Sequence, residues 1–275
     1  MLVFGSSAFL WLHAPVDLRR TLSPEIKRLA VAASLILLAT ACLWLCLEAA
    51  SMADDWSAAT DPGAIAAVLI DTSFGHAWIL HLALAAALAA AAVLAPRNRW
   101  TAIAVLSALL LASLALVGHA AMQTGAVGIV HRANHAVHLL AAGAWIGGLI
   151  PFVMCLNAYA RNTLRSEAVT AMMGFSFSGH FVVAAIVATG VANIAMTSGH
   201  APFPAATPYR ALIDVKIALV AVMIGLAIVN RYALVPQLKS RAGALAALRA
   251  ITLANVALGT TVVALVSLFA LLDPN

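Results

Sequence analysis

Three histidines in the segment HRANHAVH, residues 131–138, have a spacing that suits joint metal binding. His131, His135 and His138 follow an i, i+4, i+7 pattern, which on an α-helix places them on one face over about 10 Å. Two imidazoles three or four residues apart on a helix lie close enough to hold one metal ion. The spacing therefore predicts a helical face with metal-binding chemistry.

Further side chains that bind metals are expected at the same end of the neighbouring helices. Imidazole binds copper in either oxidation state and thioether favours Cu(I), so a mixture of histidine and methionine favours copper. Three methionines, Met52, Met122 and Met196, are expected near that end. The predicted metal ligands are His76, His81, His119, Met122, His131, His135, His138, Met196 and His200.

A structural role is the alternative explanation for these residues. Histidines at a membrane interface can hydrogen-bond carbonyl groups without a metal, and methionine fills gaps in any apolar bundle. Paired histidines on neighbouring helices can also hold a haem, which would imply electron transfer. In that case His135 or His138 would pair with His76, His81 or His180.

Polar and sulfur side chains deeper in the apolar runs form a possible ion pathway. Cys42 and Cys46 share a helix face at i, i+4 and as thiolates could receive Cu(I), although the favoured interpretation is two small buried apolar side chains. Asn193, Asp214 and Lys216 lie in later runs, where polar residues also serve as hydrogen-bond partners between helices.

The composition identifies the environment of these helices. Of 275 residues, 64% are hydrophobic and 9% are charged, whereas soluble domains carry roughly a quarter charged residues. Segments of about 20 apolar residues satisfy their own backbone as helices in lipid, and strict alternation typical of barrel strands is absent. The sequence therefore predicts an all-α integral membrane protein, a bundle of about eight transmembrane helices. The apolar runs cover about 1–16, 26–50, 76–95, 100–122, 133–158, 170–198, 211–235 and 247–272.

The basic residues sort to one side of this predicted bundle. Although the net charge is +5, the charges form short clusters between apolar runs, which argues against nucleic-acid binding. Twelve of the fifteen Lys and Arg residues fall on one side, which the positive-inside rule assigns to the cytoplasm. Both termini are then periplasmic, as is the loop 51–75, whose acidic side chains could dock a basic carrier protein. These side chains are Asp54, Asp55, Asp61 and Asp71.

Several other function classes lack their sequence signals. No Walker A motif is present, so any transport would be passive, exchange-driven or coupled to an ion gradient. No Ser–His–Asp or paired-carboxylate arrangement stands out, so the sequence does not predict an enzyme. The three cysteines are an odd number and do not indicate a disulfide framework.

Three later segments, at 138–152, 175–193 and 207–238, resemble successive helices of a known family, copper-resistance protein D (CopD). The fifth-helix motif of that family resembles HLLAAGAWIGGLIPF, from His138 to Phe152, and its sixth helix resembles FSFSGHFVVAAIVATGVAN, from Phe175 to Asn193. Its next helix is similar to TPYRALIDVKIALVAVMIGLAIVNRYALVPQL, from Thr207 to Leu238. The resemblance is strong over about 119–272 of what is expected to be one membrane domain.

The resemblance implies a bacterial inner-membrane protein that handles copper. The family is linked to copper resistance and copper uptake, often beside a small periplasmic copper-binding protein, CopC. It implies that His119, His135 and His138 are polar positions on the outer half of the bundle. The expected function is copper import from the periplasm through the outer His/Met cluster, with a separate CopC-like carrier as partner. A copper chaperone that does not transport is the alternative within the same chemistry.

Overall fold

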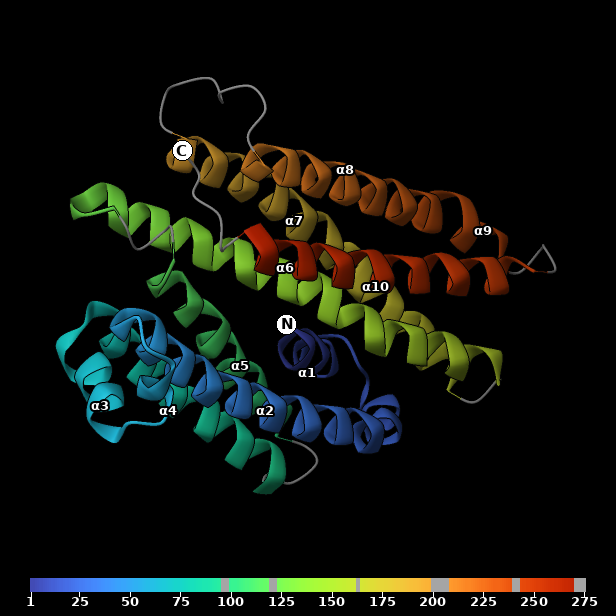
Figure 1. Ribbon diagram of the computed structural model, residues 1–275. Coiled ribbons are helices and arrows are strands. Elements are labelled where there is room, and N and C mark those ends of the chain that lie inside the picture. The colour runs from blue at the N-terminus through green and yellow to red at the C-terminus, as the bar shows by residue number, and fades with distance from the viewer. Residues whose placement is uncertain (95–98, 119–122, 162–163, 199–207, 239–242, 270–275) are drawn as a thin grey trace.

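The computed structural model describes residues 1–94, 99–118, 123–161, 164–198, 208–238 and 243–269, and every element in these ranges is helical (Figure 1). The main helices are α1 (Leu2–Leu12), α2 (Val16–Ala53), α3 (Pro62–Asp71), α4 (Ser73–Leu94), α5 (Trp100–Ser113), α6 (Gly125–Ala160), α7 (Arg165–Ser198), α8 (Pro208–Ile228), α9 (Val235–Gln237) and α10 (Ala244–Phe269). Short 3-10 turns η1 (Trp56–Ala59) and η2 (Leu114–Leu116) and a π-helical turn η4 (Val229–Leu234) join them.

Six helical segments are long and apolar enough to cross a membrane, which confirms the predicted all-α membrane class. These segments are Val16–Ala53, Ser73–Leu94, Gly125–Ala160, Arg165–Thr197, Arg210–Gln237 and Ala244–Ser267. The first and fourth predicted runs form the shorter helices α1 and α5, and the latter continues through η2 to Leu116.

Helix α6 lies at the centre of the bundle and packs against α1, α5, α7 and α10. Glycines let α1 approach its middle: a Cβ on Gly5 would lie only 2.6 Å from the carbonyl carbon of Gly147. The Ser6 hydroxyl donates a hydrogen bond of 3.0 Å to the Gly147 carbonyl. The first residues of α1 therefore lie against the middle of α6, next to Gly143 and Gly147.

Helix α2 begins at Val16, well before the predicted start at residue 26. Leu18, Leu22 and Ile26 are buried in the core at i, i+4, i+8 spacing, so the charged residues between them stay on the opposite face. Uninterrupted apolar runs do not reveal such a helix start, because charged residues on its other face interrupt the run. Helix α6 likewise begins at Gly125 rather than near residue 133, which brings the whole HRANHAVH segment into one helix.

The segment predicted as a loop over 51–75 contains η1 and α3. Two of its carboxylates cap these turns: Asp55 accepts from the Ser57 amide at 2.9 Å, and Asp61 accepts from the Gly63 amide at 3.0 Å. Hydrogen bonds from the hydroxyl and the amide of Ser57 lower the pKa of Asp55, so its carboxylate keeps its charge. Both residues remain exposed at the surface.

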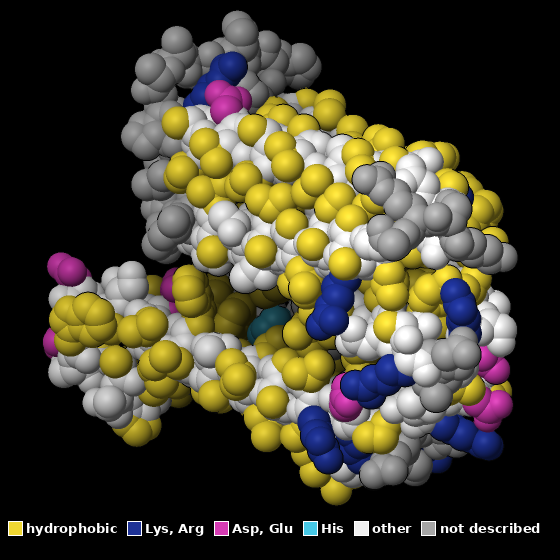
Figure 2. Space-filling view, turned by 90° about the vertical axis from the view of Figure 1, so that its right-hand side faces the viewer, with side chains coloured by type: hydrophobic (Ala, Val, Ile, Leu, Met, Phe, Trp, Pro, Cys, Tyr) yellow, Lys and Arg dark blue, Asp and Glu magenta, His cyan; other side chains and the backbone are white. Residues whose placement is uncertain are grey.

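Basic side chains gather at the opposite end of the bundle (Figure 2). Near this end Arg19 donates to the Ala14 carbonyl at 2.9 Å, and Arg165 donates to the Tyr159 hydroxyl at 2.6 Å. The membrane-spanning helices therefore separate an end rich in Lys and Arg from the end that carries α3.

Candidate metal site

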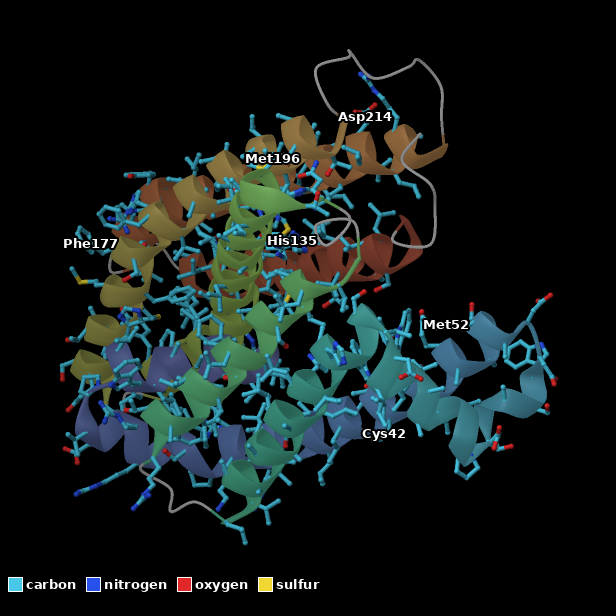
Figure 3. All side chains as sticks on the ribbon, turned by 90° about the vertical axis from the view of Figure 1, so that its left-hand side faces the viewer. Cys42, Met52, His135, Phe177, Met196 and Asp214 are labelled. Atoms are coloured by element: carbon cyan, nitrogen blue, oxygen red, sulfur yellow. The ribbon has the colours of Figure 1, made fainter. Side chains whose placement is uncertain are left out.

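All three histidines of the HRANHAVH segment lie within α6. Their polar partners belong to α7 or hydrogen-bond to it. Their nearest polar partners come from Gln123, Thr189 and Asn193. Figure 3 shows His135 close to the end of α7 that carries Met196, on the side of the molecule opposite the basic end. The predicted one-face arrangement follows from the helical spacing, because the three residues share a face of an unbroken helix.

The first histidine, His131, is 3% exposed and is held from the start of its own helix. Its Nδ1 lies 3.0 Å from Oε1 of Gln123, whose Nε2 donates to the backbone carbonyl of Met196 at 2.7 Å. Met196 therefore meets this cluster through its backbone oxygen. The Gln123 amide joins the beginning of α6 to the end of α7.

The third histidine, His138, packs against α7 at Thr189 and Gly190. Its Nδ1 lies 2.9 Å from Oγ1 of Thr189, which is itself buried and donates to the Ala185 carbonyl at 2.5 Å. Gly190 makes room for the ring, since a Cβ there would lie 3.5 Å from Cε1 of His138. The Thr189 hydroxyl and the close approach of α7 at Gly190 thus help to position the imidazole.

The central histidine, His135, contacts a pair of asparagines. Nδ2 of Asn193 lies 3.4 Å from Nδ1 of His135, and Oδ1 of Asn193 accepts from Asn134 Nδ2 at 2.8 Å. The same Asn134 nitrogen donates to the Thr189 carbonyl at 3.0 Å. The predicted pathway residue Asn193 therefore lies beside the histidine face.

A positive charge also lies near this face. The Lys216 ammonium of α8 is close enough for its charge to act on both His135 and His138. Asp214, two residues earlier on the same helix, is exposed and pairs with Arg210 at 3.6 Å. Of the two predicted pathway residues on α8, the structure brings Lys216 to the histidines and leaves the Asp214 carboxylate in an ion pair at the surface.

Two further predicted ligands have structural partners elsewhere. Nε2 of His76 lies 2.9 Å from the Ile70 carbonyl and joins α4 to α3. His81 is 6% exposed, with its Nδ1 2.8 Å from the Ser113 hydroxyl and its ring stacked on Trp78 at 4.6 Å between centroids. Predicted ligands that lie outside the described residues are His119, Met122 and His200.

The cysteine pair lies apart from the histidine face. Cys42 and Cys46 belong to α2, which packs on α4, and Cys42 is exposed. Figure 3 shows Cys42 and Met52 on the side of the molecule formed by α2 to α4, away from His135. Within the described residues, α6, α7 and α8 therefore bring together only part of the predicted set: His131, His135, His138, Asn193 and Lys216.

The described residues contain no group of three or more His, Cys, Asp or Glu side chains that could hold a metal ion as they stand. Metal binding on α6 would therefore begin from two neighbouring imidazoles. The described residues also give no support to a haem pair, because His76 and His81 have partners near α3 and α5. His180 instead lies 3.1 Å from the Tyr232 hydroxyl.

Sequence reasoning missed Gln123 and Thr189, which contact histidines, and Asn134, which bonds to Asn193 beside His135. A signal for one of them existed in the sequence: Thr189 and Asn193 are separated by four residues and so share a face of α7. A polar stripe on one apolar helix can indicate the face that meets a polar stripe on another.

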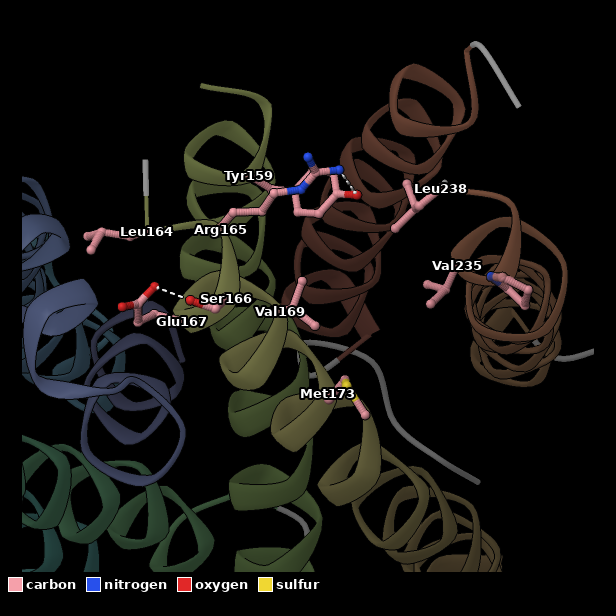
Figure 4. A pocket seen from close by; sticks show the side chains of 10 residues that line it. Tyr159, Leu164, Arg165, Ser166, Glu167, Val169, Met173, Val235 and Leu238 are labelled. Atoms are coloured by element: carbon pink, nitrogen blue, oxygen red, sulfur yellow. Dashed lines mark hydrogen bonds between the residues drawn. The ribbon is translucent and has the colours of Figure 1, made fainter. Parts of the chain in front are cut away.

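A pocket lies where α6 ends and α7 begins, near the basic end and away from the histidines (Figure 4). It contains none of the predicted ligands. Arg165 lies over the Tyr159 ring, 4.2 Å from its centroid, and Ser166 donates to Glu167 at 2.9 Å. Its remaining lining residues are mainly apolar: Leu164, Val169, Met173, Val235, Pro236 and Leu238. The pocket therefore carries a packed cation beside apolar surface rather than metal-binding groups.

Comparisons with known proteins cover both halves of the chain. A family model described as "Copper resistance protein D-like, N-terminal domain" matches residues 1–129, and one described as "Copper resistance protein D" matches residues 169–269. The inner membrane protein YebZ of Escherichia coli is 34% identical over 100% of this chain and 94% of its own length. Copper resistance protein D of Pseudomonas syringae is 30% identical over 86% of this chain and 78% of its own length.

A more distant match involves a larger protein. Copper transport protein CutJ of Bacillus subtilis is 32% identical over 50% of this chain and 26% of its own length. No solved structure matches the chain. The resemblance seen over about 119–272 thus extends to the N-terminal half, where the first family model matches.

Proposed function

Because this chain belongs to the copper-resistance protein D family of multi-pass inner-membrane proteins, we propose that it imports copper from the periplasm towards the cytoplasm. In this proposal the whole chain acts as one membrane domain that binds and moves an ion. Catalysis is not part of its role. Two of its relatives are named for copper resistance and copper transport, which supports copper as the cargo.

One observation carries the proposal to particular residues, namely the histidine face of α6. His131, His135 and His138 line up on a helix that also contacts Asn193 and Thr189 of α7. Ionisable side chains inside a membrane bundle are costly and by default mark a functional site. Imidazoles bind both Cu(I) and Cu(II), so this face is our proposed first binding site for copper entering the bundle.

Additional ligands would complete the coordination from neighbouring segments. His119, Met122 and His200 stay predictions. In the sequence, His119 and Met122 come shortly before α6, and His200 comes shortly after α7. A thioether from Met122 or Met196 would favour Cu(I). Beyond this first site, the proposed inward path passes Asn193 and Lys216 of the same cluster.

The proposed orientation places the basic end in the cytoplasm and the α3 end in the periplasm. The distribution of Lys and Arg supports it, because cytoplasmic connections of membrane proteins carry the excess of these residues. The count of about eight membrane segments includes α1 and the α5–η2 segment besides the six long ones. Both termini would face the periplasmic side, with α1 leading from the middle of α6 towards the basic end.

A periplasmic carrier of the CopC kind is the proposed source of copper. The exposed acidic segment around η1 and α3 supports such docking, because Asp54, Asp55 and Asp61 are all exposed there. Charge complementarity of this kind raises association rates and specificity more than affinity. A basic surface on the carrier would therefore be its matching feature.

The test is the copper content of the purified protein, measured by mass spectrometry after loading under oxidising and under reducing conditions. We expect bound copper in the parent and its loss in the His135→Ala/His138→Ala double variant. His76→Ala is the control, because His76 is exposed and contacts the Ile70 carbonyl away from α6, and it should retain copper. A parent that binds no copper under either condition would contradict the proposal.

Cellular copper distinguishes import from a chaperone role. We expect cells that express the parent to accumulate more copper than cells that express the double variant. Equal accumulation, with copper bound to the purified parent, would instead indicate a protein that presents copper to a partner without transporting it.

A further inference from the structure

The hydrogen bonds around the three histidines determine which nitrogen of each ring carries its proton. A neutral imidazole has one N–H donor and one acceptor nitrogen, and a metal binds only the acceptor. The partner on one ring nitrogen therefore decides whether the other nitrogen can bind a metal. Each partner can be assigned as donor or acceptor from groups that allow only one role.

At His138 the assignment starts from the Thr189 hydroxyl. This hydroxyl has a single proton, which it donates to the Ala185 carbonyl at 2.5 Å. Toward His138, Thr189 Oγ1 therefore accepts, and Nδ1 of His138 is the donor at 2.9 Å. Nε2 of His138 is then left with a lone pair, as in the metal-binding form of histidine.

At His131 the assignment starts from a backbone carbonyl. The Met196 carbonyl can only accept, so the nitrogen of the Gln123 amide faces it at 2.7 Å. The oxygen of the same amide then faces His131, and Nδ1 of His131 donates to it at 3.0 Å. Nε2 of His131 is thus also free of its proton.

At His135 the same reasoning gives the opposite result. The Thr189 carbonyl can only accept, so Asn134 presents its nitrogen there, and that nitrogen also donates to Oδ1 of Asn193. The Asn193 NH2 group therefore faces Nδ1 of His135, 3.4 Å away, and that ring nitrogen accepts. The ring proton of His135 must then lie on Nε2.

This difference matters because His135 is the middle residue of the face. His131 and His138 are seven residues apart, about 10 Å along the helix, which is too far for both to bind one ion directly. Any pair of neighbouring imidazoles on α6 includes His135. In the present arrangement that shared residue offers an N–H group at Nε2 where a ligand needs a lone pair.

We propose that Asn193 is a latch that keeps His135 in its non-binding tautomer until copper arrives, a role that rests on the proposed copper function of this face. Opening the latch moves the ring proton from Nε2 to Nδ1 and rotates the Asn193 amide, so that Oδ1 accepts from Nδ1. That rotation breaks the hydrogen bond between Asn134 and Asn193. Asn193 is therefore a positioning residue, and Thr189 has the opposite effect by holding His138 ready to bind.

The tautomers can be read directly from protein without metal. In 15N-histidine-labelled protein in detergent, protonated and bare ring nitrogens have well-separated resonances, and the His135→Gln variant identifies the signals of His135. We expect a protonated Nε2 and a bare Nδ1 for His135, and the reverse for His131 and His138. A protonated Nδ1 on His135 of the parent would overturn the proposal.

Two variants of Asn193 test the latch, and the first of them leaves the charge of the site unchanged. Asn193→Ala removes the amide that faces Nδ1, so we expect His135 to populate both tautomers and Cu(I) affinity to rise about threefold. Asn193→Asp supplies only acceptors, so Nδ1 of His135 should become the donor and affinity should rise about tenfold or more. An unchanged His135 spectrum or a loss of affinity in Asn193→Ala would contradict the latch and leave Asn193 only the role on the ion path proposed above.

Two substitutions of Thr189 test its opposite effect, which is to hold His138 ready to bind. Thr189→Val removes the acceptor of the His138 proton and should lower Cu(I) affinity about tenfold, whereas Thr189→Ser keeps the hydroxyl and should restore it. Equal affinities for Val and Ser would contradict the role of Thr189. Parent tautomers as predicted, in a protein that binds no copper in any variant, would instead refute the proposed function while leaving the hydrogen-bond assignment intact.

Discussion

At the scale of single residues, three histidines of one helix differ because their partners differ. In the assignment proposed above, Thr189 and Gln123 each accept a hydrogen bond from one histidine, while the Asn193 amide donates to the third. Ring nitrogens that bind a metal usually rely on an acceptor at the other nitrogen. The chemistry of the face is therefore set as much by the neighbouring polar residues as by the histidines.

A charge close to the histidines gives a prediction at this scale. The Lys216 ammonium acts on His135 and His138 and should oppose a bound copper cation by Coulomb repulsion. Lys216→Gln should therefore raise copper affinity by about three- to tenfold, measured by competition with a chelator of known affinity. Arg249→Gln, an exposed site at the start of α10, is the control and should leave affinity unchanged.

A fall in copper affinity for Lys216→Gln would show a different role for this residue. In that case the ammonium would be supporting the site through its own partners, and the repulsion argument would be wrong.

At the scale of helices, close approach through glycine decides how α1 packs on α6. Gly5 and Gly147 meet backbone to backbone, and Ser6 adds a hydrogen bond to the Gly147 carbonyl. Because helix association in lipid lacks a hydrophobic driving force, van der Waals contact and interhelical hydrogen bonds must hold such a pair together. Small residues at the contact are therefore necessary for this packing.

The glycine contact predicts a loss of stability in Gly5→Ala. Its Cβ would lie 2.6 Å from the Gly147 carbonyl carbon, so backbone must move, and overpacking of this kind costs about 1–3 kcal/mol. The Tm of the purified protein in detergent should fall. Gly179→Ala in α7 is the control, as its Cβ would meet nothing within 4 Å and alanine favours a helix.

An unchanged Tm for Gly5→Ala, together with an unchanged Tm for the control, would mean that α1 does not dock on α6 in this manner.

Helix boundaries show where sequence reasoning succeeded and where it stopped. The apolar runs 170–198 and 247–272 matched α7 and α10 closely, because a chain that forms no barrel satisfies its backbone in lipid only as helix. The start of α2 was missed, since Leu18, Leu22 and Ile26 form an apolar stripe among charged residues. Such a stripe becomes visible only through the core that it packs against.

At the scale of the whole molecule, the distribution of charge gives the proposed orientation. Exposed carboxylates cluster around η1 and α3, whereas Lys and Arg gather at the other end of the bundle. Transmembrane helices connect these ends, so the two surfaces should be reached from opposite sides of the membrane.

Cysteine labelling tests this orientation. In a chain whose Cys42, Cys46 and Cys155 are replaced by alanine, Thr60→Cys should react with a membrane-impermeant maleimide added to intact spheroplasts. Ser166→Cys should react only after the membrane is permeabilised, because it lies at the basic end. Both positions are exposed, so the comparison depends on membrane side alone, and the reverse pattern would refute the orientation.

The sequence by itself determined the membrane class, the long helices, the family resemblance and the one-face spacing of His131, His135 and His138. Each depends on composition or on distances along the chain, which a helix translates directly into space. Only the tertiary structure decided which polar groups meet that face, because Thr189, Asn193 and Lys216 come from other helices. It also separated Cys42, His76 and His81 from the cluster, since packing between helices, which spacing along the chain does not encode, sets their neighbours.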